Sequence, residues 1–479
     1  MVELVASASM TEERLWEIAA EIADIPEVVG AGITSYAGGT AGHDPIKVAK
    51  GAHERGLNPN VHLTCVNHEA ADIAKALEDL AGNGIENILA LTGDYPKHAP
   101  LGTVGYACDS VQLVETIAEQ RGAGKWPFYI SVAVSPFKYL EEDCAYQYLK
   151  LEKKIAAGAD FAITQIGFDS RKFRELKRYL DERGLTTPVL GNVYVLPPKA
   201  AERMSKGDPP GCWVSPELLA RIQEEAKAPD KGVAARLERA AQMVAILRGL
   251  GYAGAYFGGT HDHQRIRWII QRSEELATRW EELAEQINYG QKGGFYFFEG
   301  SKPAPKKREW TQPLFDILEP ANWASPLRKT LTGILRWVDG SPAMAHALES
   351  AELAFKKPVF GCQACGNCVL GLMEFVCPMT CPKNLRNGPC GGTFNGQCEV
   401  IPEKPCIWVA VYDRAQAANR VDELKTYIPP RNRALQGTSS YINYLLDRDS
   451  RPEHPQPLIS INNIQPARSE EAEASLVKK

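Results

Sequence analysis

Short apolar runs alternate with amphipathic stretches over residues 1–287 of the chain. The runs are rich in β-branched residues, which is typical of buried strands. The stretches between them repeat apolar residues at i, i+3, i+4 and i+7, which predicts helices that cover a sheet with one face. We expect helices over Glu12–Ala23, Glu69–Ala81, Ala145–Ala157 and Arg171–Arg183, and strands over Val2–Ala6, Val28–Thr34, Asn60–Thr64, Asn87–Thr92, Phe128–Ser135, Phe161–Gln165, Pro188–Val195 and Gly254–Phe257.

The alternation of strands and helices predicts the fold class. A strand that is followed by a helix and then another strand is typical of parallel pairing. Eight such units within residues 1–287 match the count of a (β/α)8 TIM barrel. An open doubly wound sheet is the alternative, and the absence of a G-x-G-x-x-G motif after the first strand favours the barrel.

The rest of the chain divides into three parts with different patterns. The pattern over residues 288–358 predicts a connector with helices around Leu327–Val338 and Ala343–Phe355. Residues 359–412 form a small cysteine-rich module that needs inorganic crosslinks, and we expect its core to be separate from that of the barrel. Residues 413–479 are a polar, proline-rich extension whose charged end, Ser469–Lys479, we expect to be disordered.

The cysteine module has the spacing of a metal or iron–sulfur site. The chain has 12 cysteines, and 8 of them lie in this module, which in a reducing cytosol favours metal ligation over disulfides. A C-x2-C-x2-C run lets three thiolates reach one cluster, and a remote cysteine completes the set. Two [4Fe–4S] clusters are favoured, and two four-cysteine zinc sites are the alternative. The expected ligands, whose division between the two sites the spacing leaves open, are Cys362, Cys365, Cys368, Cys377, Cys381, Cys390, Cys398 and Cys406.

Composition narrows the class of protein. The 479 residues are 44% hydrophobic and 24% charged, with a net charge of −5, so no overall basic field attracts nucleic acid or an anionic membrane. The first 30 residues lack the layout of a signal peptide, and no apolar run is long enough to span a membrane. These features predict a cytoplasmic protein.

Polar side chains stand where several of the predicted strands end. In a barrel of this class the carboxyl ends of the strands carry the chemistry. Such residues also commonly open loops and cap helices, so each of them alone is weak evidence, and the set is stronger. The candidates from five strands are Glu3, Thr34, His62, Asp94 and Gln165.

Two groups of motifs resemble a known family. His62-Leu-Thr-Cys65, Asn87-Ile-Leu-Ala-Leu-Thr-Gly-Asp94 and the segment Ala156–Gln165 are similar to methylenetetrahydrofolate reductase, over about residues 2–276. The cysteine module resembles the C-terminal domain found with these reductases. Its markers are Phe360-Gly-Cys-Gln-Ala-Cys-Gly-Asn-Cys368, Cys377-Pro-Met-Thr-Cys-Pro-Lys383 and Asn387-Gly-Pro-Cys-Gly-Gly392.

The resemblance implies a flavin-containing barrel that passes a hydride to the methylene carbon of a reduced folate. Glu3 matches the catalytic acid that protonates the folate nitrogen, and Gln165 a substrate-binding glutamine. Asp94 matches the folate-binding aspartate near the flavin ring, with the implied catalytic role of tuning the electrostatics of the flavin and of the folate iminium. FAD is the expected flavin. FMN stays open as an alternative, because Thr92 stands where many relatives have arginine and Gln147 stands where some have aspartate. The implied flavin contacts are Thr34, His62, Thr92, Gly93, Asp94, Tyr106, Gln147, Lys153, Lys154 and Ala159.

The resemblance also implies how electrons reach the flavin. NAD(P)H or a reduced carrier is the expected donor, and an electron-transfer protein is a candidate partner at the cysteine module.

The expected reaction interconverts 5,10-methylene- and 5-methyltetrahydrofolate, and the protein is expected to form a homo-oligomer. Two alternatives stay open: oxidation of methyl-folate in one-carbon catabolism, and a catalytically weak electron-transfer scaffold. Glu3 lies so close to Met1 that a natural start upstream of Met1 also stays open.

Overall fold

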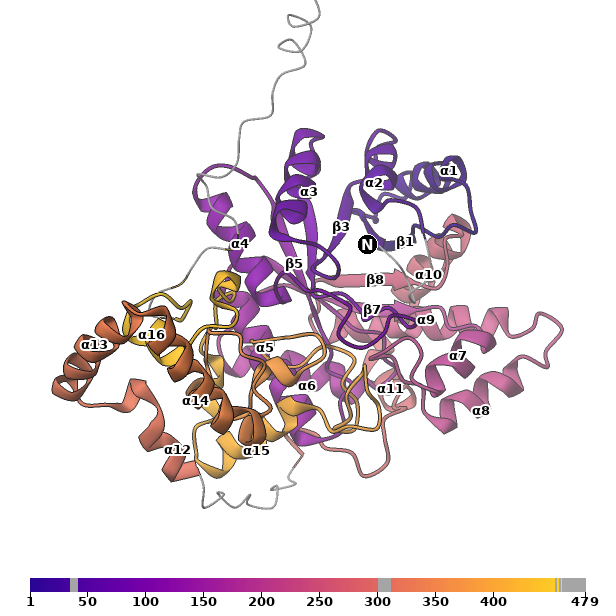
Figure 1. Ribbon diagram of the computed structural model, residues 1–479. Coiled ribbons are helices and arrows are strands. Elements are labelled where there is room, and N and C mark those ends of the chain that lie inside the picture. Colours follow the sequence, from indigo (N-terminus) through magenta and orange to yellow (C-terminus); the bar gives the residue numbers. More distant parts are fainter. Residues whose placement is uncertain (35–41, 300–311, 453–454, 456–457, 459–479) are drawn as a thin grey trace, which may run out of the picture.

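Eight parallel strands form a closed barrel in chain order (Figure 1). The computed structural model describes residues 1–34, 42–299, 312–452, 455 and 458. The predicted (β/α)8 barrel is therefore confirmed, and the open sheet is excluded. The strands are β1 (Val2–Val5), β2 (Ala31–Thr34), β3 (Pro59–Thr64), β4 (Asn87–Leu91), β5 (Tyr129–Val134), β6 (Phe161–Thr164), β7 (Val189–Tyr194) and β8 (Gly254–Gly258).

The first strand closes the barrel although it begins at the second residue of the chain. β1 pairs with β2 along its whole length, and Val2 pairs with Phe257 of β8. The Met1 amino group donates a hydrogen bond to the Ala255 carbonyl oxygen at 2.8 Å, which extends the contact with β8. Glu3 lies opposite Gly32 in this register, so its position in the barrel is fixed by both neighbouring strands.

The helices cover the barrel as the apolar periodicity predicts. α1 has the predicted bounds, whereas α5 begins at Glu141, before the predicted start at Ala145. The three acidic residues of its first turn explain the difference, because carboxylates stabilise a helix N-terminus. The helices of this part are α1 (Glu12–Ala23), α2 (Pro45–His53), α3 (Ala70–Gly82), α4 (Ser110–Gly122), α5 (Glu141–Ala156), α6 (Ser170–Glu182), α7 (Pro198–Ser205), α8 (Pro216–Glu225), α9 (Val233–Gly249), α10 (His263–Leu276) and α11 (Trp280–Gln286).

Side chains fill the barrel on both sides of its wall. Val2 and Leu4 are fully buried beneath the helices, and the alternation of a strand turns Glu3 to the interior. A second apolar cluster lies inside the barrel and contains Leu89, Phe161, Ile163 and Tyr256. The interior is thus a packed core, which leaves the chemistry to the ends of the strands.

The remaining helices belong to the C-terminal part of the chain. The helices expected around Leu327–Val338 and Ala343–Phe355 are confirmed by α13 and α14. α14 ends at Phe360, and Gly361, in the left-handed conformation, caps it directly before the first cysteine of the module. These helices are α12 (Gln312–Leu318), α13 (Ser325–Asp339), α14 (Pro342–Phe360), α15 (Ile407–Ala417) and α16 (Ser440–Leu445).

The cysteine module shares a core with the barrel. Tyr146 and Leu149 of α5 pack in one apolar cluster with Trp408 and Tyr412 of α15, and the module lies against α5 in Figure 1. The Tyr146 and Trp408 rings meet edge to face, with centroids 5.5 Å apart. The expectation of a separate core is therefore wrong for this half of the module, because one face of α5 is its wall.

The C-terminal extension packs on the module as far as it is described. The buried Asn367 side chain donates to the Ser450 carbonyl oxygen at 2.8 Å and accepts from the Asn432 backbone N–H at 2.9 Å. Asn443 donates to the Gly366 carbonyl oxygen at 2.8 Å. The end expected to be disordered, Ser469–Lys479, lies outside the described residues. Within the described part of the chain, every helix is too short or too polar to cross a membrane.

Candidate active site at the barrel rim and the cysteine module

Glu3 is a half-buried carboxyl group inside the barrel. It comes from β1, and a Cβ added to Gly258 of β8 would lie 3.0 Å from its Oε2 atom. Tyr194 and Tyr256 also line its surroundings, since the Glu3 charge acts on the pKa of both phenols. Burial raises the pKa of Glu3 to about 7. A carboxyl group with this pKa can donate a proton at neutral pH.

His62 of β3 meets Tyr256 of β8 across the interior of the barrel. Its Nε2 atom lies 3.3 Å from the Tyr256 hydroxyl, and burial lowers the pKa of His62 to about 4. The imidazole is therefore neutral at physiological pH. Gly32 makes this contact possible, because a Cβ at that position would lie 2.0 Å from the Tyr256 hydroxyl.

The end of β4 leads into three of the predicted site residues. The Thr92 hydroxyl accepts a hydrogen bond from the Ser110 backbone N–H at 3.1 Å, so Thr92 supports the start of α4. Gly93 has φ +91°, and a Cβ there would lie 2.7 Å from Val66, so this turn requires glycine.

Asp94 stands at this rim, with 59% of its side chain exposed. Burial of the carboxyl group and the charge of Glu399 raise its pKa, while Lys383 and Lys97 act in the opposite direction. Lys383 and Glu399 come from the cysteine module, so the electrostatics of this barrel residue depend on both parts of the chain.

Several buried polar atoms of the barrel part have no hydrogen-bond partner among the described residues. They include the Thr34 hydroxyl, the Tyr106 hydroxyl and the Lys153 ammonium group. Burial lowers the pKa of Lys153 to about 7, as it does for Lys154, which donates to the Ala133 carbonyl oxygen at 2.6 Å. Buried polar groups without a hydrogen-bond partner lower the stability of the folded state unless a ligand or a water molecule bonds to them. Their residues thus fit the polar groups of a bound cofactor.

The structure does not bring every predicted residue to this rim. Ala159 precedes β6 and adjoins Asp160, which bonds to the start of β5 at Ile130, so Ala159 lies at the opposite end of the barrel. Gln147 donates to the Cys390 carbonyl oxygen at 3.0 Å, so its amide group holds the cysteine module. Gln165 does lie at the end of β6, where its Oε1 atom accepts from the Ile166 backbone N–H at 2.9 Å.

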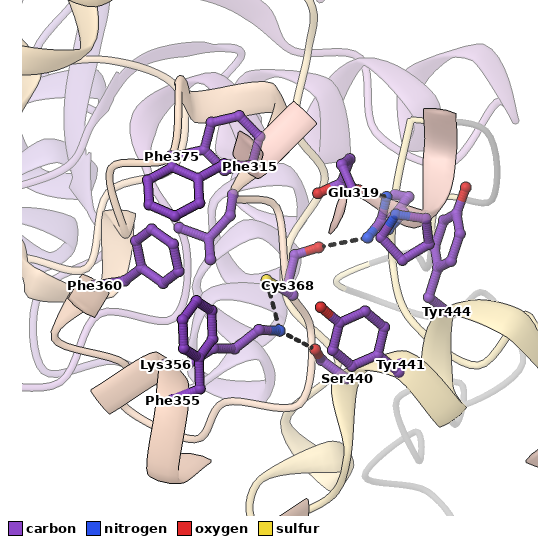
Figure 2. Close-up of a pocket in the computed structure, with 13 residues that line it drawn as sticks. Phe315, Glu319, Phe355, Lys356, Phe360, Cys368, Phe375, Ser440, Tyr441 and Tyr444 are labelled. Atoms are coloured by element: carbon purple, nitrogen blue, oxygen red, sulfur yellow. Dashed lines mark hydrogen bonds and ion pairs between the residues drawn. The ribbon is translucent and has the colours of Figure 1, made fainter. Parts of the chain in front are cut away.

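The first four cysteines of the module surround one recess. Cys362, Cys365, Cys368 and Cys377 all line one pocket. Figure 2 shows the neighbouring pocket, where the Lys356 ammonium group reaches the Cys368 sulfur at 3.7 Å and the Ser440 hydroxyl at 2.8 Å. The Phe315, Phe360 and Phe375 rings line that pocket beside Cys368.

The other four cysteines form a second group beside the barrel. The Thr393 hydroxyl lies 3.8 Å from the Cys390 sulfur and 3.6 Å from the Cys406 sulfur. Cys381 and Cys398 belong to the same group, since the charges of both act on the pKa of Cys406. The fold thus divides the eight cysteines into the first four and the last four. In the described part of the chain, no three histidine, cysteine or acidic side chains are gathered closely enough to hold one metal ion.

The sequence analysis missed the polar contacts that join the module to the barrel. The Asp109 carboxylate, at the N-terminus of α4, accepts from the backbone N–H groups of Arg386 at 3.1 Å and Asn387 at 3.0 Å. The fully buried Lys138 donates to the carbonyl oxygens of Gly391, at 2.7 Å, and Thr393. Asp109 carries only the signal of a helix cap, and nothing in the local sequence marks Lys138.

A closed (β/α)8 barrel with ionisable side chains at the carboxyl ends of its strands is the architecture of a barrel enzyme. The family profile described as Methylenetetrahydrofolate reductase matches residues 7–272, and the profile described as Methylene-tetrahydrofolate reductase C terminal matches residues 341–434. The first match covers more than half of the chain. The chain belongs to the methylenetetrahydrofolate reductase family.

Individual relatives match shorter segments. Methylenetetrahydrofolate reductase 2 of Schizosaccharomyces pombe is 29% identical over 248 residues, which cover 47% of this chain and 37% of that protein. The 5,10-methylenetetrahydrofolate reductase of Salmonella typhimurium is 32% identical over 148 residues, which cover 30% of this chain and 47% of that protein. The chain thus spans less than half the length of these curated relatives.

The fold also has solved neighbours at lower similarity. One is a protein of Clostridium thermocellum whose structure is described as binding two copies of 5-methyl-5,6,7,8-tetrahydrofolic acid. It has a TM-score of 0.42 and 10% sequence identity, and the match covers 58% of this chain and 96% of that chain.

Proposed function

We propose that this protein is a flavin-dependent methylenetetrahydrofolate reductase that interconverts 5,10-methylene- and 5-methyltetrahydrofolate. The observation that carries the proposal is Glu3, a carboxyl group inside the barrel whose pKa of about 7 suits proton transfer at neutral pH. It lies in a chain of this family, below a rim of polar atoms without partners. Flavin, when bound, supplies the hydride that reduces the folate methylene carbon.

Glu3 is the proton donor of this reaction. Opening of the methylene bridge requires a proton on the folate nitrogen. The methylene carbon, which is then part of an iminium group, accepts the hydride. A carboxyl group that held its ordinary pKa near 4.5 would be almost wholly ionised at pH 7, whereas about half of Glu3 carries a proton there. The same residue accepts the proton in the reverse direction, so the assignment holds for oxidation of methyl-folate as well.

The polar groups of the rim hold the flavin, for which FAD is proposed. The Thr34 and Tyr106 hydroxyls are free to bond flavin oxygen and nitrogen atoms, and neutral His62 can donate or accept one hydrogen bond. Lys153 and Lys154 rise from α5, and a phosphate group beside them would return their lowered pKa values toward the ordinary range. Gln165 and Asp94, at two of the strand ends, bind the folate.

The cysteine module carries two [4Fe–4S] clusters that exchange electrons with the flavin, with zinc as the alternative. Two groups of four thiols match two clusters with four ligands each. Two zinc sites with four cysteine ligands each would use the same eight thiols and would add folding energy without redox chemistry. With a cluster bound there, the Lys356 hydrogen bond to the Cys368 sulfur would tune the cluster potential.

The proposal is tested with the full chain, purified under strictly anaerobic conditions. Flavin, iron and zinc are measured first, and oxidation of 5-methyltetrahydrofolate by an artificial electron acceptor is then assayed for wild type and Glu3→Gln. The control is Glu86→Gln, an exposed carboxyl group at the other end of the barrel. We expect bound flavin, wild-type turnover in the control, and a loss of about a hundredfold or more in Glu3→Gln. A protein without flavin, or without folate turnover, contradicts the proposal.

A further inference from the structure

The cysteine module places one buried lysine against the barrel rim. Lys383 is 2% exposed and comes from the Cys377-Pro-Met-Thr-Cys-Pro-Lys383 segment, yet its ammonium group donates to the Gly93 carbonyl oxygen of the barrel at 3.0 Å. The same group lies 4.0 Å from the Asp94 Oδ1 atom. A lysine from another part of the chain therefore donates a hydrogen bond to the backbone of the turn after β4 and lies at ion-pair distance from its carboxylate.

A second buried charge keeps this lysine in place. The Glu399 carboxylate, 3% exposed in its side chain, forms an ion pair with Lys383 at 2.5 Å. Buried ammonium groups are rare and are retained where a partner satisfies them. Lys383 is the member of the pair that reaches the barrel and lies nearest to Asp94, while the charge of Glu399 acts on Asp94 in the opposite direction.

The frame around this pair comes from the second group of cysteines. Cys381 stands two residues before Lys383, and Cys398 directly precedes Glu399. Both cysteines lie in the group that also contains Cys390 and Cys406. The loops that carry Lys383 and Glu399 therefore lie beside the same group of thiols, and the contacts with Gly93 and Glu399 position the ammonium group against the barrel.

We propose that Lys383 is a positioning residue of the folate site: it holds the Asp94 carboxylate and the turn at Gly93 in the geometry that binds the reduced folate. The active site is then composite, built by the barrel and completed by the cysteine module. This inference rests on the proposed function, because the folate-binding role of Asp94 belongs to it.

Removal of the charge has a defined expected effect. Lys383→Met keeps most of the side-chain volume and removes the contact with Asp94, while the double variant Lys383→Met/Glu399→Gln removes both buried charges. We expect the KM for 5-methyltetrahydrofolate to rise about tenfold in both, equivalent to about 1.4 kcal/mol of binding free energy. We expect kcat to change less than about threefold, because Lys383 acts on Asp94 and not on the reacting atoms.

A double-mutant cycle separates this role from a structural one. KM and kcat are measured for wild type, Lys383→Met, Asp94→Asn and the combination, with melting midpoints, flavin content and iron content for each. If Lys383 acts through Asp94, its substitution adds little to the KM of Asp94→Asn. Lys404→Met, which removes an exposed lysine of the same module, serves as the control and should match wild type.

The outcomes distinguish this inference from the proposed function. Wild-type protein without folate turnover contradicts the proposed function itself. Active wild type together with an unchanged KM in Lys383→Met and in the double variant overturns the inference alone. Fully additive KM effects of Lys383→Met and Asp94→Asn, or a loss confined to melting midpoint and metal content, also overturn it, because Lys383 would then act on folding and not on Asp94.

Discussion

Substitution of Glu3 by glutamine changes both catalysis and the pH dependence of stability. Glutamine has nearly the same shape as a protonated glutamate but cannot donate a proton to the folate nitrogen. The loss of a general acid costs about 10²–10⁴ in rate. Flavin binding and reduction of the flavin by a donor other than folate should persist in Glu3→Gln, since neither step needs this proton.

The effect on stability follows from the pKa of Glu3 in the folded protein. Since one pKa unit corresponds to about 1.36 kcal/mol, the rise from 4.5 to about 7 sets an upper limit of about 3 kcal/mol on the cost of ionising this group in the folded state. Below pH 4.5 the carboxyl group is protonated in the folded and in the unfolded state, so it does not lower the free energy of unfolding. Between pH 4.5 and about 7 the unfolded chain releases the proton first, so wild type loses stability relative to Glu3→Gln.

The assay compares melting midpoints of wild type and Glu3→Gln at pH 5 and pH 8, with Glu86→Gln as the exposed control. We expect Glu3→Gln to gain stability over wild type between the two pH values, and Glu86→Gln to show no such gain. A difference between wild type and Glu3→Gln that is independent of pH would show that the carboxyl group titrates normally. Near-normal folate turnover in Glu3→Gln would separately remove Glu3 from the mechanism.

Three further predictions concern the rim and the module. Asp94→Asn should raise the Kd for folate about tenfold, measured by titration of the flavin spectrum, with little change in melting midpoint; a variant that merely unfolds would identify Asp94 as structural. Gly32→Ala should lower stability by about 1–3 kcal/mol in chemical denaturation, because its Cβ overlaps the Tyr256 hydroxyl; an unchanged midpoint would refute the packing. Cys365→Ser should lower iron content while flavin content holds, measured by elemental and absorbance analysis; iron at the wild-type level would exclude Cys365 as a ligand.

The barrel could be predicted because its signal is local. Each strand and helix repeats its apolar positions with the period of its own geometry, and strand–helix alternation leaves few topologies open. The ends of the strands follow from the same pattern. The amino-acid sequence alone therefore predicts that Thr34, Asp94 and Gln165 lie at or just after strand ends, and the structure places Glu3 and His62 within their strands.

The composite part of the site could not be predicted in this way. Lys383 and Gly93 are 290 residues apart in sequence, and their contact arises only when the module docks on α4 and α5. The grouping of the cysteines depends on the same docking, since spacing alone allows several divisions of eight thiols. Ala159 shows the opposite error. The resemblance assigns it to the flavin site, but it lies in the connection between α5 and β6, at the other end of the barrel.

The most direct test of the central claim is a single-turnover experiment with the flavin as the reporter. Anaerobically purified protein is reduced and mixed with 5,10-methylenetetrahydrofolate in a stopped-flow spectrometer, and the products are quantified. The account predicts that the flavin is reoxidised by the folate and that one 5-methyltetrahydrofolate forms per flavin. A flavin that stays reduced in the presence of the folate, or a protein that holds no flavin, would contradict it.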